Sequence, residues 1–203
     1  DRALAATDAV LAGSRESAAA YLLRGDALRD LRRYNEAAEA FEKALSLEPK
    51  SATVIKLHGA LLLQDRPSAA DRQVLAWLQS HEDDVLVRTY LAESYTARGE
   101  NARAIAQYEI LLKSRPDDPV FTNNLAWLYF KSGDDRALAT ARQAHRLAPE
   151  RPAVLDTLGW ILVDRGELDE GVPLLARAAR ETEEAGVQLH LSLIHISEPT
   201  RPY

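Results

Sequence analysis

Small, large apolar and polar positions recur along this chain with a period close to 34 residues. Each period contains a small residue, then a large apolar or aromatic residue three positions later, then a second amphipathic stretch. The small residues, which lie 34, 33, 34 and 33 residues apart, are Gly25, Gly59, Ala92, Ala126 and Gly159. A repeat of this length with two amphipathic segments predicts a series of helical hairpins.

Five full hairpins fit this register. We expect each small residue to let the two helices of its hairpin approach closely, and the hairpins to stack into one solenoid over residues 1–190. The first helices should line the concave face of this solenoid. The hairpins are expected at residues 18–51, 52–84, 85–118, 119–151 and 152–184, with partial repeats at 1–17 and 185–196.

Glycine and proline mark the expected helix ends. A glycine in the left-handed conformation should end three of the first helices, because glycine has no Cβ to clash there. These glycines are Gly99, Gly133 and Gly166. Pro119 and Pro152 should open first helices, where a missing N–H costs nothing. Pro173 falls inside an expected second helix and predicts a late start or a kink at that point.

The motif positions resemble those of the tetratricopeptide repeat (TPR) family. Residues 18–51 carry the family's spacing at Gly25, Leu28, Ala37, Phe41, Ala44 and Pro49. Residues 85–118 carry it at Leu91, Ala92, Tyr95, Ala104, Tyr108 and Pro116. The resemblance extends over about residues 2–190 and implies an all-α fold, an α-α superhelix of the TPR solenoid type. It also implies a protein–protein interaction module that binds a protein or peptide in its concave groove.

A narrower resemblance covers residues 85–190, from the NNLAWLY segment onward. This part is similar to the C-terminal repeats of TPR lipoproteins encoded with the PEP-CTERM/exosortase sorting system of Gram-negative bacteria. The resemblance implies an exported, periplasmic or membrane-anchored lipoprotein with a scaffolding role in exopolysaccharide production and protein sorting. The chain begins without Met, which we interpret as a fragment or a processed product.

Composition narrows the functional classes. The formal net charge of −6 argues against a nucleic-acid partner, because phosphate binding needs a basic surface. Cysteine is absent, the five histidines are scattered, and no nucleotide-binding or hydrolase motif is present. We therefore expect no catalysis, no cofactor and no metal site. No apolar run is long enough to cross a membrane.

Two tryptophans stand at the same place in successive repeats, and we call Trp127 and Trp160 the Trp ledge. Each directly follows the small residue of its first helix, a position that we expect to face the groove. The polar and aromatic residues that share this stripe complete the candidate ligand-binding set of Tyr90, Glu93, Asn123, Asn124, Lys131, Asp156 and Asp164. An exposed indole flanked by amides suits a peptide, or alternatively stacks on the sugar rings of a polysaccharide. The competing interpretation is that both indoles pack against adjacent first helices and only tighten the superhelix.

The final segment, LSLIHISEPTRPY at residues 191–203, departs from the repeat pattern. It has β-type residues and two prolines, and no second helix follows. The string resembles an in-frame translation of a transposase adapter used in sequencing-library preparation. We expect a non-native tail, with at most one helix over residues 186–196 and irregular structure over 197–203.

Overall fold

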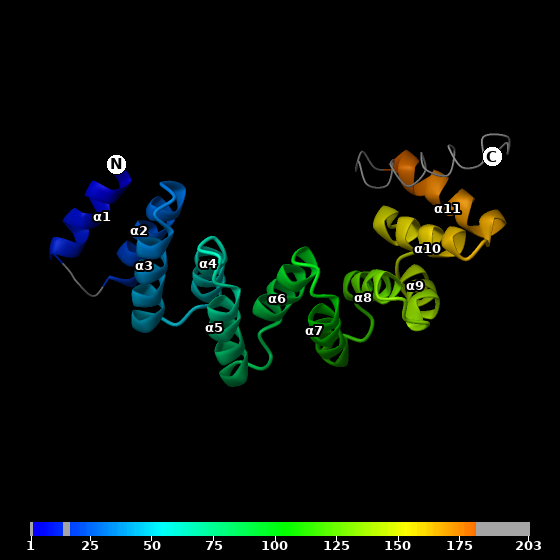
Figure 1. The fold of residues 1–203 in the computed structure, drawn as a ribbon, viewed down its shortest axis with the longest axis horizontal. Helices are drawn as coiled ribbons and strands as arrows, with labels where there is room; N and C mark the ends of the chain where they lie inside the picture. The colour runs from blue at the N-terminus through cyan, green and yellow to red at the C-terminus, as the bar shows by residue number, and fades with distance from the viewer. Residues whose placement is uncertain (1, 14–16, 182–203) are drawn as a thin grey trace. The chain divides into compact units, whose positions relative to one another are not determined.

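The structure is a computed structural model that describes residues 2–13 and 17–181, and every regular element in these residues is an α-helix (Figure 1). The helices are α1 (Arg2–Gly13), α2 (Ala18–Asp30), α3 (Tyr34–Leu47), α4 (Ser51–Leu62), α5 (Pro67–Ser80), α6 (Val85–Ala97), α7 (Asn101–Ser114), α8 (Pro119–Lys131), α9 (Arg136–Leu147), α10 (Pro152–Asp164) and α11 (Leu168–Glu181). The expected all-α class is confirmed. The expected tail at 191–203 and the partial repeat at 185–196 lie outside the described residues.

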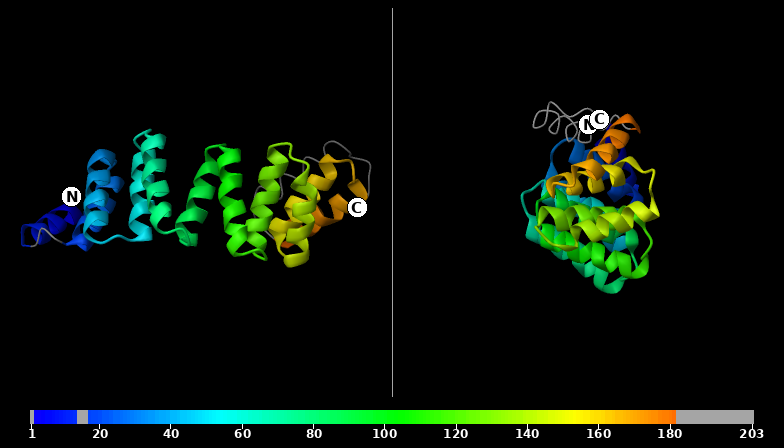
Figure 2. Two further views of the ribbon diagram at one scale, coloured as in Figure 1. Left: turned by 90° about the horizontal axis from the view of Figure 1, so that it is seen from below. Right: turned by 90° about the vertical axis from the view of Figure 1, so that its right-hand side faces the viewer.

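The chain divides into two compact units, Asp1–Leu91 and Ala92–Tyr203, which are described separately. Consecutive helices pair as hairpins within each unit, α2 with α3 and α4 with α5 in the first, and α8 with α9 and α10 with α11 in the second (Figures 1 and 2). These pairs follow the predicted register, whereas the extent of a single solenoid over residues 1–190 stays a prediction.

Left-handed residues end the first helices. Gly99, Gly133 and Gly166 have φ values of 72°, 68° and 81°, as the sequence predicted. In the first two hairpins the same place is taken by Arg32 and Asp65, whose φ values of 60° and 56° are unusual for residues with a Cβ. The backbone turn is therefore common to all five hairpins, although glycine is not.

The small residues do not all play the same packing role. A Cβ built on Gly25 would lie 2.6 Å from Cδ1 of Phe41, so the ring of α3 occupies the space that a side chain would need. At Gly59 the prediction of a close approach between the two helices is wrong. The nearest atom to a Cβ built on Gly59 is the Tyr90 hydroxyl oxygen, at 3.8 Å. Val74, the counterpart of Phe41 by sequence register, is fully buried but much smaller. The smaller side chain explains the extra room at Gly59.

Helix α11 runs from Leu168 to Glu181 with Pro173 inside it. The expected late start is therefore wrong, while the expected kink stays a prediction. Asp169 and Glu170 lie in the first turn, where the helix dipole favours negative charge. Pro173 removes a single backbone hydrogen bond, and the burial of Val172 and Leu175 holds this turn against α10.

Asp84 connects the two ends of the second hairpin. One carboxylate oxygen, Oδ2, accepts hydrogen bonds from Ser51 Oγ at 2.6 Å and from Trp77 Nε1 at 2.8 Å. The other, Oδ1, accepts the backbone N–H of Val87 at 3.0 Å and so caps the start of α6. Residues 81–84 connect α5 to α6, and within this connection His81 is exposed whereas Asp84 is half-buried.

Candidate functional site

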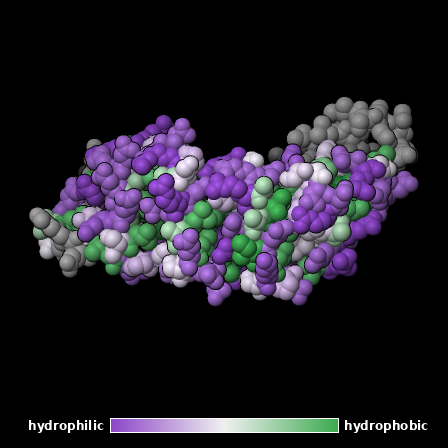
Figure 3. Space-filling model, turned by 60° about the horizontal axis from the view of Figure 1, so that its bottom comes forward, coloured by the Kyte–Doolittle hydropathy of each residue, from purple (hydrophilic) through white to green (hydrophobic). Residues whose placement is uncertain are grey.

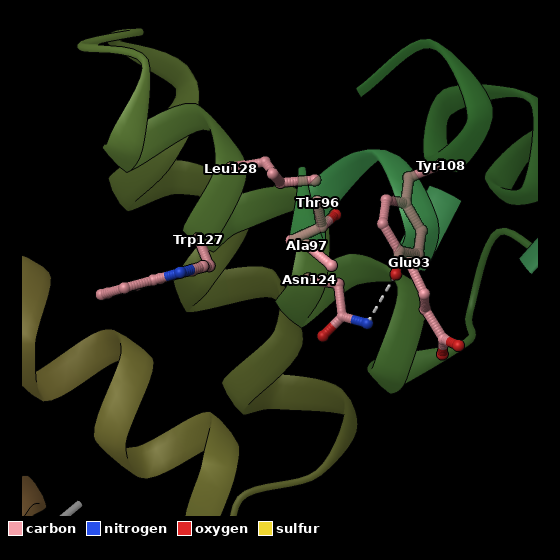
Figure 4. Close-up of a pocket in the computed structure, with 7 residues that line it drawn as sticks. All are labelled: Glu93, Thr96, Ala97, Tyr108, Asn124, Trp127 and Leu128. Carbon is pink, nitrogen blue, oxygen red and sulfur yellow. Dashed lines mark hydrogen bonds between the residues drawn. The ribbon is translucent and has the colours of Figure 1, made fainter. Parts of the chain in front are cut away.

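A pocket of about 270 Å³ opens between α6, α7 and α8 in the second unit (Figure 4). We call it the Trp127 pocket, and the residues that line it are Glu93, Thr96, Ala97, Tyr108, Asn124, Trp127 and Leu128. Three of the residues expected to bind a ligand, Glu93, Asn124 and Trp127, are thus brought to one place. The lining combines an apolar wall with an indole, an amide and a carboxylate.

Trp127 stands at the rim of this pocket and is half-buried. Figure 4 shows its indole directed away from Asn124 and Tyr108. The ring lies 5.5 Å from that of Phe130, and Lys131 Nζ lies 5.7 Å from its centroid. Lys131, also expected in the site, therefore borders the indole without lining the pocket. This arrangement leaves part of a large aromatic surface to contact a ligand.

Asn124 and Tyr108 form the polar centre of the pocket. The Asn124 side-chain amide donates from Nδ2 to the Tyr108 hydroxyl at 3.0 Å. Burial raises the pKa of Tyr108, the hydrogen bond from Asn124 opposes that rise, and the Glu93 carboxylate adds to it. The phenol therefore stays neutral at physiological pH. Its role in the pocket is to accept and donate hydrogen bonds rather than to act as a base.

Asn123 lies one turn before Trp127 on α8 and is only 8% exposed. Its side-chain Oδ1 has no hydrogen-bond partner among the described residues. A buried acceptor without a partner costs free energy, about 1–3 kcal/mol. Asn123 is therefore placed among buried residues of α8 instead of on the open stripe that the sequence suggested.

Tyr90 belongs to a different environment. Its hydroxyl lies 2.9 Å from Nδ1 of His58, whose Nε2 lies 3.3 Å from Asp71 Oδ1. His58 and Asp71 are buried, so this chain of polar contacts links α4, α5 and α6 inside the first unit. The structure does not bring Tyr90 into the Trp127 pocket.

Trp160 also differs from Trp127. It is half-buried and packs against the cluster of Val172 and Leu175 on α11. Asp156, one turn before it, is half-buried, while Asp164 is exposed as the last residue of α10. Trp160 thus contacts the second helix of its own hairpin. Its packing against an adjacent first helix and its part in a shared Trp ledge both stay predictions.

Sequence reasoning missed four lining residues, which are Thr96, Ala97, Tyr108 and Leu128. The sequence analysis named Tyr108 only as a motif position of the repeat. The sequence does contain a signal for Tyr108. The first repeat has Phe41 at the corresponding position, and Tyr108 adds a hydroxyl group that needs a hydrogen-bond partner when it is buried.

The rest of the described surface shows weaker evidence for a functional site. On the face drawn in Figure 3, hydrophobic residues form patches between hydrophilic ones. Scattered exposed apolar side chains are normal and do not by themselves make a site. In residues 2–13 and 17–181 no cluster of three or more His, Cys, Asp or Glu is placed to hold a metal ion. Within the same described part, no helix is both long enough and apolar enough to span a bilayer.

Comparison with protein families assigns the repeats. Two family models, each described as tetratricopeptide repeat, match residues 18–51 and residues 89–152. Residues 18–51 and 89–152 therefore match tetratricopeptide repeats, a class of repeat that forms protein–protein interaction scaffolds.

A curated relative supports the same assignment. The chain is 29% identical over 185 residues to the TPR repeat-containing protein PA4667 of Pseudomonas aeruginosa. This alignment covers 85% of the chain but only 30% of the relative, so the chain spans less than a third of that protein's length.

Solved structures share the fold. YrrB, described as a TPR protein with an unusual peptide-binding site, is 24% identical, has a TM-score of 0.57, and covers 76% of this chain and 80% of its own. Tom70 of yeast is 16% identical with a TM-score of 0.70, over 96% of this chain and 42% of its own. MamA is 18% identical with a TM-score of 0.63, over 83% and 93%. These similarities show that the chain has the fold of TPR solenoids.

Proposed function

We propose that this chain is a non-catalytic interaction module that binds an extended peptide segment of a partner protein at the Trp127 pocket. The observation that carries the proposal is the convergence of Trp127, Asn124 and Glu93 on one pocket, each from a position on a first helix. Aromatic side chains supply a large contact area at low entropic cost, and few polar groups are needed to fix orientation.

The amide of Asn124 gives the pocket a way to recognise peptide backbone. Its Nδ2 is used by Tyr108, which leaves Oδ1 without a partner in the described part of the chain. An amide oxygen of this kind accepts a backbone N–H of an extended ligand. The exposed Glu93 carboxylate favours a ligand with a basic side chain near an apolar one.

The wider setting of the proposal rests on the narrower sequence resemblance. We infer an exported protein, periplasmic or membrane-anchored as a lipoprotein, that holds partners together in a bacterial exopolysaccharide and protein-sorting system. The curated relative supports the repeat class, and the PEP-CTERM association rests on residues 85–190 alone.

A peptide array probed with the purified chain tests the proposed function. Peptides that bind would then be measured against the variants Trp127→Ala and Glu93→Gln, with Ile110→Ala as a control that removes an exposed apolar side chain of α7 outside the pocket. We expect weaker binding by about tenfold or more for Trp127→Ala, a smaller loss for Glu93→Gln, and no change for the control. If neither Trp127→Ala nor Glu93→Gln weakens peptide binding, the pocket is not the binding site.

The same variants test the alternative function, a carbohydrate-binding accessory that uses the Trp ledge. If polysaccharide fragments bind while no peptide does, and if both Trp127→Ala and Trp160→Ala remove that binding without unfolding the chain, the peptide proposal is wrong. The half-exposed indole of Trp127 suits either ligand, but the packing of Trp160 against α11 favours the peptide.

A further inference from the structure

A second hollow, of about 300 Å³, lies between the second helices α9 and α11 above α10. We call it the α9–α11 groove, and the residues that line it are Arg142, His145, Arg146, Leu158, Glu170 and Leu174. None of these residues lines the Trp127 pocket, so the groove is a separate feature of the second unit.

Ion pairs connect α9 and the turn after it to α11. Arg142 pairs with Glu170 at 3.0 Å and with Glu167 at 3.5 Å. Further along both helices, Arg177 pairs with Glu150, which follows α9. In the order of the chain, Arg146 lies between Arg142 and Glu150, and Leu174 lies between Glu170 and Arg177. The groove is therefore bounded by two sets of paired charges.

Between these ion pairs lie the side chains of Arg146 and His145. Arg146 is exposed and His145 is half-buried, and neither has an ion pair within the described residues. The buried face of α9 consists of Ala137, Ala141 and Ala144, so the long side chains of its last two turns are directed to this edge. An unpaired guanidinium is notable in a chain whose net charge is −6.

Beneath these groups the groove is apolar. Leu158 of α10 is only 2% exposed, and Leu174 is half-buried against the cluster of Leu155 and Ala178. A cation beside an apolar floor matches a ligand that has a carboxylate next to an apolar side chain, because each part then finds a complementary surface.

We propose that the α9–α11 groove is a second binding site, which takes an aspartate or glutamate side chain of a partner protein together with an adjacent apolar side chain. The carboxylate binds Arg146, and the apolar side chain packs on Leu158 and Leu174. A volume of about 300 Å³ is at the lower end for ligand pockets, so one or two residues of the partner enter the groove. Together with the Trp127 pocket, this groove lets the module hold two partner segments at once.

The test uses the whole chain and an acetylated, amidated pentapeptide, Gly-Leu-Glu-Leu-Gly, titrated while the backbone amide signals are followed by NMR. Signals of His145, Arg146 and Leu174 should shift. The variant Arg146→Ala should bind about tenfold more weakly, as expected for the loss of one charge-assisted hydrogen bond. Lys113→Ala is the matched control, because Lys113 takes the same place in the last turn of α7 and is likewise exposed.

Two further peptides decide the chemistry. A pentapeptide with glutamine in place of glutamate should lose most of the affinity, and a free C-terminal Gly-Leu peptide without glutamate should bind no better than the glutamine peptide. Equal binding of the glutamine peptide, tighter binding of the free C-terminus, or an unchanged Arg146→Ala variant would each overturn the proposal. Trp127→Ala should leave these titrations unchanged, which separates this site from the peptide site proposed above.

Discussion

A Cβ atom built on Gly171 of α11 would lie 2.7 Å from the carbonyl oxygen of Gly159 on α10. The converse holds as well, since a Cβ on Gly159 would lie 2.9 Å from the carbonyl oxygen of Gly171. These two helices therefore meet backbone to backbone. A backbone contact of this kind cannot be relieved by the rotation of a flexible side chain.

Gly171→Ala should destabilise the chain. The new methyl group meets backbone and Val163 atoms at 2.7 to 3.0 Å, so α10 and α11 must separate. Overpacking typically costs about 1–3 kcal/mol, which exceeds the roughly 1 kcal/mol that alanine gains in helix propensity. Urea unfolding followed by circular dichroism measures the difference. An unchanged or raised midpoint would show that the two backbones are not in contact.

Gly59→Ala should have the opposite effect. Gly59 holds the same register position as Gly159, but only the Tyr90 hydroxyl approaches it, at 3.8 Å. The substitution should therefore stabilise α4 by about 0.5–1 kcal/mol through helix propensity alone. A loss of stability would mean that α4 and α5 pack too closely at Gly59 to admit a methyl group, despite the small side chain of Val74.

Arg32→Gly should also stabilise the chain. Arg32 has a φ of 60°, in the left-handed region that glycine adopts at the equivalent places in later hairpins. Relieving this conformation is worth about 1 kcal/mol, reduced by the greater freedom of glycine in the unfolded chain. Gly99→Ala is the reverse substitution and should lower the free energy of unfolding. Equal stability of all three proteins would argue against strain at Arg32.

Asp84 should make stability depend on pH. Burial alone would raise the pKa of this carboxyl group, but hydrogen bonds from Ser51, the Val87 backbone and Trp77 outweigh burial and lower it. Because the folded pKa is lowered, the stabilisation is complete above the ordinary value of about 4 and is lost as pH falls through the folded pKa. Asp84→Asn should cost about 1–3 kcal/mol at pH 7, and less at pH 2. A constant difference between the two proteins from pH 7 to pH 2 would contradict this account.

The sequence predicted the helix ends and helix starts that depend on local backbone chemistry. Helix ends at Gly99, Gly133 and Gly166 follow from backbone conformation, and the starts at Pro119 and Pro152 follow from the missing N–H of proline. Of the two alternatives predicted at Pro173, the late start is wrong, since one absent hydrogen bond was outweighed by the burial of Val172 and Leu175, and the kink stays a prediction.

What the sequence did not predict depends on contacts between distant residues. Ser51 and Asp84 are 33 positions apart, and His58 and Tyr90 are 32 apart, so each pair joins neighbouring repeats. A repeat pattern shows which positions correspond, but it does not show which side chains form hydrogen bonds. The same limit applies to the site. Trp127 and Trp160 hold the same register position, yet one borders a pocket lined by α6, α7 and α8 and the other packs on α11.

Trp127→Ala should separate binding from stability. The indole is half-buried at the rim of the pocket, so its removal should lower the free energy of unfolding by at most about 1–2 kcal/mol. Peptide affinity should fall by about tenfold or more, because aromatic anchors dominate interfaces. Trp160→Ala is the matched control and should show the reverse, with a larger loss of stability and little change in affinity.

The indole N–H signals of the chain test the central claim most directly. The sequence has three tryptophans, Trp77, Trp127 and Trp160, so an NMR titration with a peptide selected on the array follows three assigned signals. The account predicts that the Trp127 signal shifts with the bound fraction, while the signal of Trp77, whose Nε1 is bonded to Asp84, does not move. A titration in which Trp127 stays unchanged while the peptide binds would contradict it.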